Sequence, residues 1–163
     1  MRIEDLMTHA VHTCFAHDTL EQVAHAMWDC DTGCLVVIDD YRRPIGIVTD
    51  RDVAMTAYKQ AAPLHALQAR VAMSTDLVTC YPGTTVRELE HQMQVAQLRR
   101  VPVIDTAGIL VGIVTLSDLA QSAQLSSTPM NELPGVATTL AIVTRRRSSR
   151  PAPDVSRDAF GSE

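Results

Sequence analysis

A duplication within the chain is the feature that most restricts its fold. Shifting the sequence by 66 residues, so that Met7 falls on Met73, aligns it with itself without a gap as far as Asp118. The matching stretches include GIVTDRD at 46–52 with GIVTLSD at 112–118, and VID at 37–39 with VID at 103–105. An internal repeat of this kind indicates one structural unit used twice. The sequence therefore predicts two similar halves that pack on each other.

Each half has the pattern of a strand, a helix, two strands and a second helix. The capping box Thr19-x-x-Gln22, repeated as Thr85-x-x-Glu88, marks the start of the first helix in each half. Two short runs rich in β-branched residues follow and predict strands joined by a polar turn. The predicted strands cover 11–14, 34–38 and 45–48, then 77–80, 101–104 and 110–114, and the second helices begin at about 51 and 117. The expected fold class is α/β (α+β), with tandem β-α-β-β-α repeats whose helices cover the strands around an internal pseudo-two-fold axis.

Changes in composition divide the chain into four parts. They are a first repeat at 1–60, an Ala- and Leu-rich linker at 61–71 expected to be a short helix, a second repeat at 72–124, and a tail rich in Ser, Pro and Arg at 125–163. The tail is expected to be disordered or loosely docked, and its apolar stretch 136–143 can dock as a strand or as a helix. Near the N-terminus, Ile3, Leu6 and Met7 predict one helical turn that packs on the first half.

The charge distribution argues against nucleic acid as a partner. The chain has a net charge of −5, and the negative charge lies in the two repeats, so there is no broad basic surface for a phosphate backbone. No apolar run is long enough for a membrane helix, and Glu4 and Asp5 stand where a signal peptide would be apolar. We therefore expect a cytoplasmic protein. In the tail, Arg145–Arg147 and Arg150 can contact an acidic partner, and Ser148 or Ser149 can be phosphorylated, but a solvated tail is the favoured interpretation.

The cysteines and histidines do not form a recognisable metal or catalytic pattern. The four cysteines include Cys30 and Cys34 at a C-x3-C spacing, but the chain has no CxxC pair and no HxxxH helix. Small buried thiols are the favoured interpretation, with a metal or redox sensor as the alternative. His25 and His91 occupy matching positions on the first helices and are expected to be surface or packing residues. Because no catalytic triad, Walker loop or carboxylate pair stands out, we expect a protein that is not an enzyme.

The repeated motif G-h-h-T-x-x-D has a structural and a functional interpretation. Thr49 and Asp52, like Thr115 and Asp118, have the spacing of a helix N-cap with an acid in the first turn. A glycine on the preceding strand permits a close backbone approach or an unusual φ. The same geometry places free N–H groups, a hydroxyl and a carboxylate at one opening, where the carboxylate can accept hydrogen bonds from a ribose and the N–H groups can meet a phosphate. The residues alone do not decide between the two interpretations.

Over residues 1–122 the paired repeats resemble the cystathionine-β-synthase (CBS) domain pair. The resemblance rests on the two G-h-h-T-x-x-D copies, on CLVVID at 34–39 and RRVPVID at 99–105, and on TCYPGTTVRELEHQM at 79–93. It implies a regulatory module that binds adenosine-containing ligands, namely AMP, ADP, ATP or S-adenosylmethionine, with no obligatory cofactor and no metal. The ligand-binding residues that it implies are Thr49, Asp52, Thr115 and Asp118, with Arg51, Arg99 and Arg100 near the phosphate and Thr13, Cys14, Thr79 and Cys80 lining the adenine pocket.

The two implied sites differ in charge. Gly33 and Cys34 stand in the first half where Arg99 and Arg100 stand in the second, and Asp50-Arg51 corresponds to Leu116-Ser117. The sites are therefore expected to differ in affinity or in the number of phosphates bound. The resemblance also implies a homodimer in which two chains associate through their helices into a flat disc. The apolar candidates for that face are Met27, Trp28, Met55 and Tyr58.

Three hypotheses follow for the function. In the first, the chain senses adenosine-containing ligands and changes the behaviour of a regulated partner protein that the sequence does not identify. In the second, it is a ligand-free structural or dimerisation module whose Thr-x-x-Asp pairs only cap helices. In the third, Cys and His residues make it a metal or redox sensor.

Overall fold

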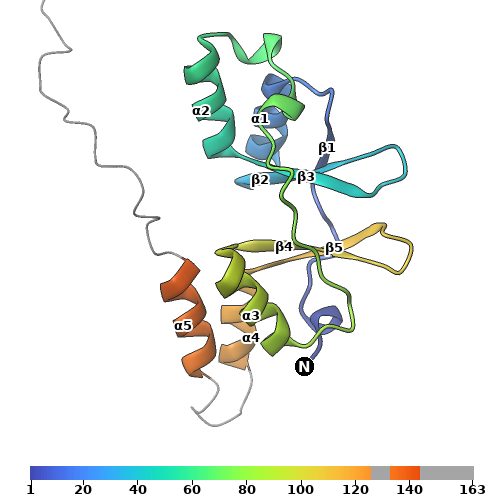
Figure 1. Cartoon of the computed structure of the whole chain (residues 1–163), viewed down its shortest axis with the longest axis vertical. Helices are drawn as coiled ribbons and strands as arrows, with labels where there is room; N and C mark the ends of the chain where they lie inside the picture. Colours follow the sequence, from blue (N-terminus) through green and yellow to red (C-terminus); the bar gives the residue numbers. More distant parts are fainter. Residues whose placement is uncertain (126–132, 144–163) are drawn as a thin grey trace, which may run out of the picture.

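The computed structural model describes residues 1–125 and 133–143, and it has the predicted β-α-β-β-α order (Figure 1). The elements of the first repeat are β1 (Thr13–Phe15), α1 (Leu20–Asp29), β2 (Cys34–Ile38), β3 (Pro44–Thr49) and α2 (Asp50–Gln60). Those of the second are α3 (Val86–Ala96), β4 (Arg100–Ile104), β5 (Leu110–Thr115) and α4 (Leu116–Leu125), followed by α5 (Leu133–Val143). The predicted strand at 77–80 is reduced to one parallel bridge, between Cys80 and Val103. Within the described residues, no helix is both long and apolar enough to cross a membrane.

The two repeats pair their strands in the same way. In the first, β1 is parallel to β2 and β2 is antiparallel to β3; in the second, β4 is antiparallel to β5. Even the irregularity in the ladder recurs, after Val37 in one repeat and after Val103 in the other. The two sheets lie against each other at the centre of the molecule, with α1 and α2 on one outer side and α3, α4 and α5 on the other (Figure 1). A small apolar cluster between the sheets contains Val36, Ile38 and Leu110.

Each repeat also has its own core between the sheet and its helices, because alternate strand residues point to opposite faces. In the first core Leu35 and Val37 of β2 meet Val23 and Met27 of α1. The first helices begin where the capping boxes predict: the Gln22 amide donates to Thr19 Oγ1 over 3.2 Å, and the Glu88 amide donates to Thr85 Oγ1 over 3.3 Å. The sequence therefore predicted the helix starts correctly.

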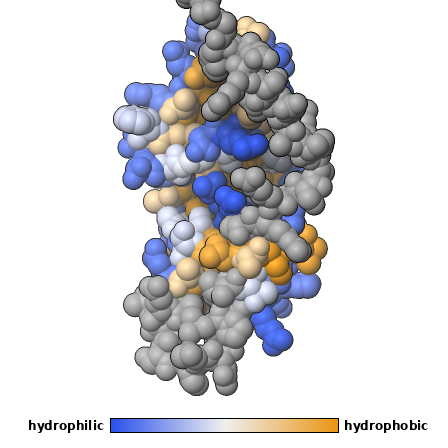
Figure 2. All heavy atoms as spheres, turned by 90° about the vertical axis from the view of Figure 1, so that its left-hand side faces the viewer, coloured by the Kyte–Doolittle hydropathy of each residue, from blue (hydrophilic) through white to orange (hydrophobic). Residues whose placement is uncertain are grey.

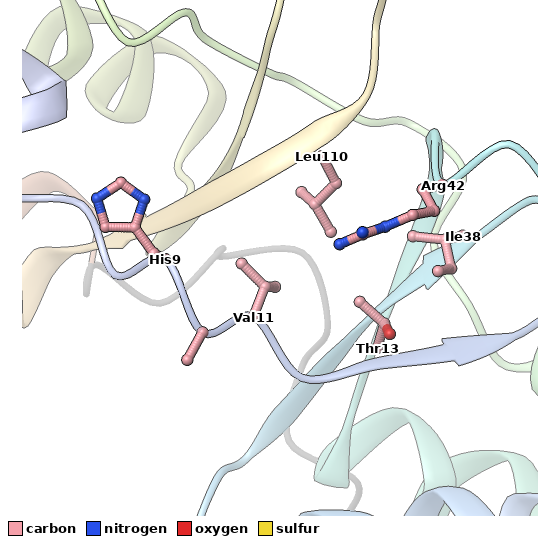
Figure 3. Close-up of a pocket in the computed structure, with 7 residues that line it drawn as sticks. His9, Val11, Thr13, Ile38, Arg42 and Leu110 are labelled. Carbon is pink, nitrogen blue, oxygen red and sulfur yellow. The ribbon is translucent and has the colours of Figure 1, made fainter.

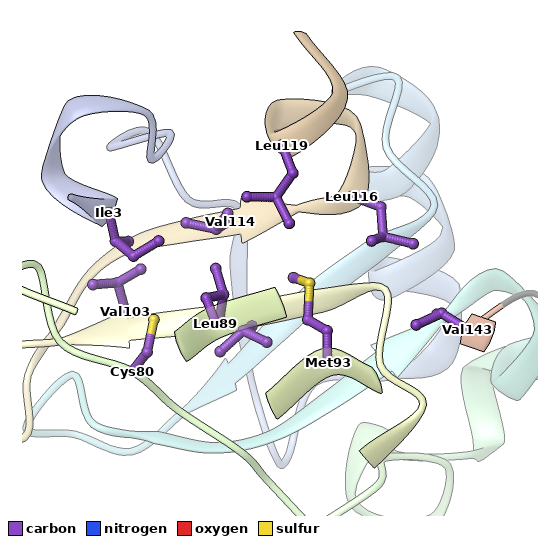
Figure 4. Packing of buried hydrophobic residues seen from close by; sticks show 10 residues of the cluster. Ile3, Cys80, Leu89, Met93, Val103, Val114, Leu116, Leu119 and Val143 are labelled. Carbon is purple, nitrogen blue, oxygen red and sulfur yellow. The ribbon is translucent and has the colours of Figure 1, made fainter. Parts of the chain in front are cut away.

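The N-terminal turn η1 (Ile3–Asp5) packs on the second repeat, so the expectation that it packs on the first half was wrong. Ile3 is fully buried in the second core, and Figure 4 shows its side chain beside Val103 and Val114. Its amide donates to the carbonyl of Thr84 over 3.0 Å. An apolar turn is equally suited to either core, so its amphipathic pattern did not indicate which repeat it joins.

The linker makes the reciprocal contact with the first repeat. It contains two short 3-10 turns, η2 (Leu64–Ala66) and η3 (Ala69–Val71), in place of the expected helix. Ala69, which the repeat aligns with Ile3, is fully buried in the first core. Beyond the turns, Ser74 pairs with Ile47 of β3, just as Thr8 pairs with Ile113 of β5. The segment that leads into each repeat therefore packs on the other repeat.

The apolar stretch of the tail forms a helix. α5 lies beside α3 and α4 in Figure 1, with Thr139 fully buried and Val143 part of the second core. The Gln94 side-chain amide donates to Thr139 Oγ1 over 2.7 Å. This contact decides between the two expectations for 136–143 in favour of a docked helix. Arg145–Arg147, Ser148, Ser149 and Arg150, which the sequence also singled out, lie outside the described residues.

Candidate functional site

The first repeated motif forms a closed capping box at the junction of β3 and α2. Thr49 Oγ1 donates to Asp52 Oδ2 over 2.6 Å, and the Thr49 amide donates to the same oxygen over 2.9 Å. The Asp52 amide in turn lies 3.3 Å from Thr49 Oγ1. These reciprocal bonds satisfy N–H groups that the first turn of a helix leaves free. The cap that the sequence predicted is therefore present.

The second motif repeats this geometry at the junction of β5 and α4. Asp118 Oδ2 accepts hydrogen bonds from the amide and from the hydroxyl of Thr115, each over 2.7 Å. In both repeats the bonds converge on Oδ2, and no described residue donates to Oδ1 of Asp52 or Asp118. A carboxylate oxygen has two lone pairs. The cap therefore leaves each aspartate able to accept further hydrogen bonds from a ligand.

Each cap lies beside the first residue of the neighbouring strand, β2 in the first repeat and β4 in the second. In register, Cys34 of β2 pairs with Thr49, and Arg100 of β4 pairs with Thr115. The hydrogen bond from the Asp50 amide to the Gly33 carbonyl is 3.2 Å long, and the equivalent bond from Leu116 to Arg99 is 3.0 Å long. Positions 33–34 and 99–100 are thus held beside the helix starts, as a shared phosphate-binding role would require.

A charged opening lies where the two repeats meet. A Cβ built on Gly33 would be 3.5 Å from Nη2 of Arg100 and 3.3 Å from Oδ2 of Asp50. The Arg100 guanidinium of the second repeat therefore reaches the helix start of the first. On the side of the molecule that Figure 2 shows, hydrophilic residues lie across the middle between more apolar areas. The alignment of the two repeats did not predict that the Arg100 side chain reaches the other repeat, because the distance from Arg100 to Gly33 depends on how the two halves pack.

The charges at this opening affect the neighbouring thiol. Burial is the main cause that raises the pKa of the Cys34 thiol above its usual range. The positive charge of Arg100 opposes that shift, while the negative charge of Asp50 adds to it. Arg51 and Arg99 are exposed, and Arg100 is half-buried. Among the predicted phosphate contacts, Arg100 is thus the one that the structure places next to Gly33 and Asp50.

The predicted adenine-pocket residues divide into two groups. Cys14 and Cys80 are buried in the first and second cores, where burial raises their pKa to about 12 and to about 11. Thr13 precedes Cys14 on β1, so strand alternation turns its side chain to the opposite face. It lines a cavity together with Leu110 of the second repeat. Thr79 lies outside any strand and is half-buried.

The cavity that Thr13 lines has a volume of about 240 Å³ and lies beside the segment that leads into β1. The Arg42 side chain extends between Leu110 and Thr13 at this cavity (Figure 3). His9 also lines the cavity, on the segment that precedes Thr13. Sequence reasoning missed Arg42 and His9, because the repeat aligns them with Gly108 and Thr75. Both residues line one cavity only because the segment 8–13 pairs with β5 of the second repeat at one end and with β2 of the first repeat at the other.

The described residues contain no group of three or more His, Cys, Asp or Glu side chains that could hold a metal ion. His25 and His91 are exposed, as expected, and His25 Nε2 lies 3.2 Å from Asp29 Oδ2 on the surface of α1. All four cysteines are free thiols, and Cys30 is exposed while the other three are buried.

The comparisons with known proteins agree with this architecture. The family model described as CBS domain matches twice, at residues 3–57 and at residues 69–124. Both matched ranges contain a complete Thr-x-x-Asp cap.

Several curated proteins are similar in sequence. The uncharacterized protein YlbB of Bacillus subtilis is 36% identical over 124 residues, covering 76% of this chain and 82% of that protein. The CBS domain-containing protein YhcV of the same organism is 34% identical over 118 residues, covering 72% of this chain and 82% of that protein. The uncharacterized protein MK0525 of Methanopyrus kandleri is 32% identical over 104 residues, and the match spans only about half of its length, 53%.

Solved structures share the fold. The CBS-domain containing protein ATU1752 from Agrobacterium tumefaciens is 26% identical with a TM-score of 0.68, covering 76% of this chain and 99% of that one. Hypoxic Response Protein I, solved with two coordinated zinc ions, is 30% identical with a TM-score of 0.67, over 74% and 98%. The CBS domain pair of protein MJ0100, in complex with 5′-methylthioadenosine and S-adenosyl-L-methionine, is 21% identical with a TM-score of 0.68, over 76% and 96%.

Proposed function

This chain belongs to the CBS domain family, and on that premise we propose that it is a non-enzymatic regulatory module that binds an adenosine-containing ligand between its repeats. One observation carries the proposal: Arg100 of the second repeat reaches Asp50 and Gly33, next to the cap of Thr49 and Asp52 in the first. A cation, a helix start and an aspartate with a free oxygen are thereby close together. Those are the groups that a nucleotide needs for its phosphate and its ribose.

In the proposed first site, Asp52 binds the ribose hydroxyls through Oδ1, while Thr49 and the first turn of α2 face the phosphate. Arg100, with Arg51 at the helix start, neutralises the phosphate charge. The ligands of the MJ0100 pair, 5′-methylthioadenosine and S-adenosyl-L-methionine, show the class of molecule that we expect, namely an adenosine derivative.

The second site, built on Thr115 and Asp118, has fewer cations. Leu116 and Ser117 follow Thr115, and the positions that match Arg99 and Arg100 are Gly33 and Cys34. We therefore expect phosphate-bearing ligands to prefer the first site and adenosine derivatives without a phosphate to bind the second. A ligand that favours one angle between the repeats shifts the molecule toward that arrangement and so signals to a partner.

The competing function is a structural module that binds no ligand. It is favoured by one observation: both capping boxes are complete within the protein. We do not propose a zinc sensor. Although Hypoxic Response Protein I was solved with two coordinated zinc ions, the described residues of this chain contain no cluster of ligands for a metal.

Isothermal titration calorimetry with AMP, ADP, ATP, S-adenosylmethionine and adenosine tests the proposal. We expect Asp52→Asn to abolish or greatly weaken binding at the first site and Asp118→Asn to do so at the second. Asparagine retains a cap acceptor but loses the negative charge that a ribose diol prefers. The matched control is Glu88→Gln, which alters a capping box of the same type on α3, outside the cleft. If none of these ligands binds the wild-type chain, the structural module stands instead.

A further inference from the structure

The hairpin between β2 and β3 holds Arg42 in the left-handed region of backbone conformation, with a φ of 60°. Residues other than glycine are uncommon there, because Cβ crowds the backbone. The other non-glycine residues of the described chain with a positive φ are Asp31, Ala61 and Gln97, and each lies at or next to the end of a helix. A left-handed residue is common at helix ends. Among the described residues, Arg42 is thus the non-glycine residue that takes this conformation in a hairpin.

The second repeat forms the same turn with a glycine. In each hairpin one aspartate, Asp39 or Asp105, accepts hydrogen bonds from two backbone amides through Oδ1, over 2.8–2.9 Å. The left-handed position between those amides is Arg42 in the first repeat and Gly108, with a φ of 81°, in the second. Glycine adopts this conformation without a steric cost. The turn itself therefore does not require an arginine.

The Arg42 side chain extends over the cavity of about 240 Å³ that lies beside the segment leading into β1 (Figure 3). Val11, Ile38 and Leu110 give this cavity apolar walls, and Thr13 adds a hydroxyl group. Pockets that hold drug-sized ligands have volumes of roughly 300–1,000 Å³. The cavity is therefore suited to a molecule smaller than a nucleotide.

The charge of Arg42 is not neutralised by a carboxylate of the described chain. The neighbouring Arg43 differs, because its Nε donates to Asp39 Oδ2 over 2.8 Å and its guanidinium lies 5.0 Å from the centre of the Tyr41 ring. None of the ion pairs between described residues includes Arg42, and the described residues that line the cavity include no acid. The basic side chain of His9 lines the same cavity. The cavity thus combines a positive charge with apolar walls.

We propose that this cavity binds a small oxyanion, that is, the carboxylate or phosphate group of a small molecule. The planar guanidinium of an arginine presents parallel N–H groups that match two oxygens of such a group. Arg42 donates to these oxygens, the Thr13 hydroxyl donates a further hydrogen bond, and any short apolar part of the molecule lies against Val11 and Leu110. The arginine at a turn position that suits glycine is explained by this contact.

The oxyanion site is separate from the proposed adenosine sites. Neither Asp52, Asp118 nor Arg100 lines the cavity, and only Thr13 is shared with the predicted adenine pocket. The cavity also has walls from both repeats, since the Leu110 amide donates to the Arg42 carbonyl over 3.0 Å. A bound oxyanion therefore contacts both halves of the molecule. This inference does not depend on whether an adenosine derivative binds.

Amide NMR spectra of the isotope-labelled full chain, recorded during titration with inorganic phosphate and separately with butyrate, test the proposal. We expect at least one of the two anions to shift the resonances of Val11 and Thr13 in a saturable manner. Tighter binding of phosphate identifies a phosphate group as the ligand, and tighter binding of butyrate identifies a carboxylate with an apolar body. Arg42→Gly should raise the dissociation constant about tenfold or more, because a charge-assisted contact is lost. The control is Arg87→Gln, which removes a positive charge from an exposed position on α3.

Arg42→Gly also separates binding from folding, because Gly108 shows that glycine suits this turn. We expect its midpoint of urea unfolding to be at least that of the wild type. If neither anion binds the wild-type chain, or if Arg87→Gln weakens binding as much as Arg42→Gly does, the proposal is wrong. Asp118→Asn should leave anion binding unchanged, and Arg42→Gly should leave adenosine binding at the first site unchanged. A failure of the oxyanion site is therefore distinguishable from a failure of the adenosine sites.

Discussion

Met7 lies so close to Gly112 that a Cβ at position 112 would be only 2.7 Å from the methionine sulfur. The same relationship exists between Met73 and Gly46, where the distance from the sulfur is 3.0 Å. The glycine of each repeated motif therefore accommodates a side chain that arrives with the segment leading into the other repeat. Neither glycine has a positive φ. Their role is a close approach, and the two repeats are interlocked through it.

We predict that Gly46→Ala destabilises the protein more than Gly112→Ala does. A Cβ at Gly46 would be 2.9 Å from the backbone oxygen of Ser74, which is fixed by pairing with β3. A Cβ at Gly112 would be closest to the flexible Met7 side chain and 3.3 Å from the backbone oxygen of Thr8. Overpacking of this kind costs about 1–3 kcal/mol. Urea denaturation measures both losses. Met7→Ala should restore part of the stability of Gly112→Ala, and equal losses without any rescue would contradict the interlocking role.

The cap at α2 should contribute to stability even without ligand. Removing the hydroxyl in Thr49→Val eliminates the two hydrogen bonds that the hydroxyl makes with Asp52, while the bond from the Thr49 amide remains. The loss of an N-cap costs about 0.5–2 kcal/mol. The change in unfolding free energy, measured by chemical denaturation, should match that of Thr85→Val at the cap of α3. A loss at Thr49 near zero would mean that the box is held for a ligand and not for the helix.

Stability should decrease above about pH 9 because of the buried thiols. Burial raises the pKa of Cys14 to about 12 and of Cys80 to about 11 from an ordinary value of 9.0. The unfolded chain loses the two thiol protons at a lower pH than the folded protein does. The contribution of the buried thiols to the free energy of unfolding is therefore complete below pH 9 and is lost as the pH rises through the folded-state pKa values. The unfolding free energy measured from pH 8 to pH 11 should decrease less steeply in Cys14→Ala/Cys80→Ala. Identical slopes would show that the thiols ionise freely in the folded protein.

Replacing Arg100 should change which ligands bind. In Arg100→Gln, the guanidinium next to Asp50 and Gly33 is lost, and a charge-assisted hydrogen bond to a phosphate contributes about 1.5–3 kcal/mol. We therefore expect AMP affinity to decrease by about tenfold or more, while adenosine affinity stays nearly constant. Calorimetry on both ligands measures the difference. A parallel loss for adenosine would place Arg100 at the base or the ribose. Arg87→Gln serves as the control, because Arg87 is exposed on α3 and is not among the predicted ligand-binding residues.

Most of the fold was predictable because its determinants are local. The capping pairs at Thr19 and Thr85 set the helix starts through hydrogen bonds between residues three apart. Short apolar runs rich in β-branched residues predicted the strands. The gapless repeat indicated that the second half would form the same unit as the first. The family of the chain followed from the same motifs. The caps at Asp52 and Asp118 were predictable for the same reason.

The remaining features depend on which surfaces meet. Ile3 and Ala69 are apolar enough for either core, so only the packed structure decided that each joins the opposite repeat. Arg100 reaches Asp50 because the two sheets lie face to face, and the helix α5 packs on the helices of the second repeat. The sequence by itself determined the repeated unit, its caps and its family, since these arise from neighbours along the chain. The tertiary structure alone decided how the repeats interlock and how they differ, because contacts between distant segments depend on packing that no local pattern encodes.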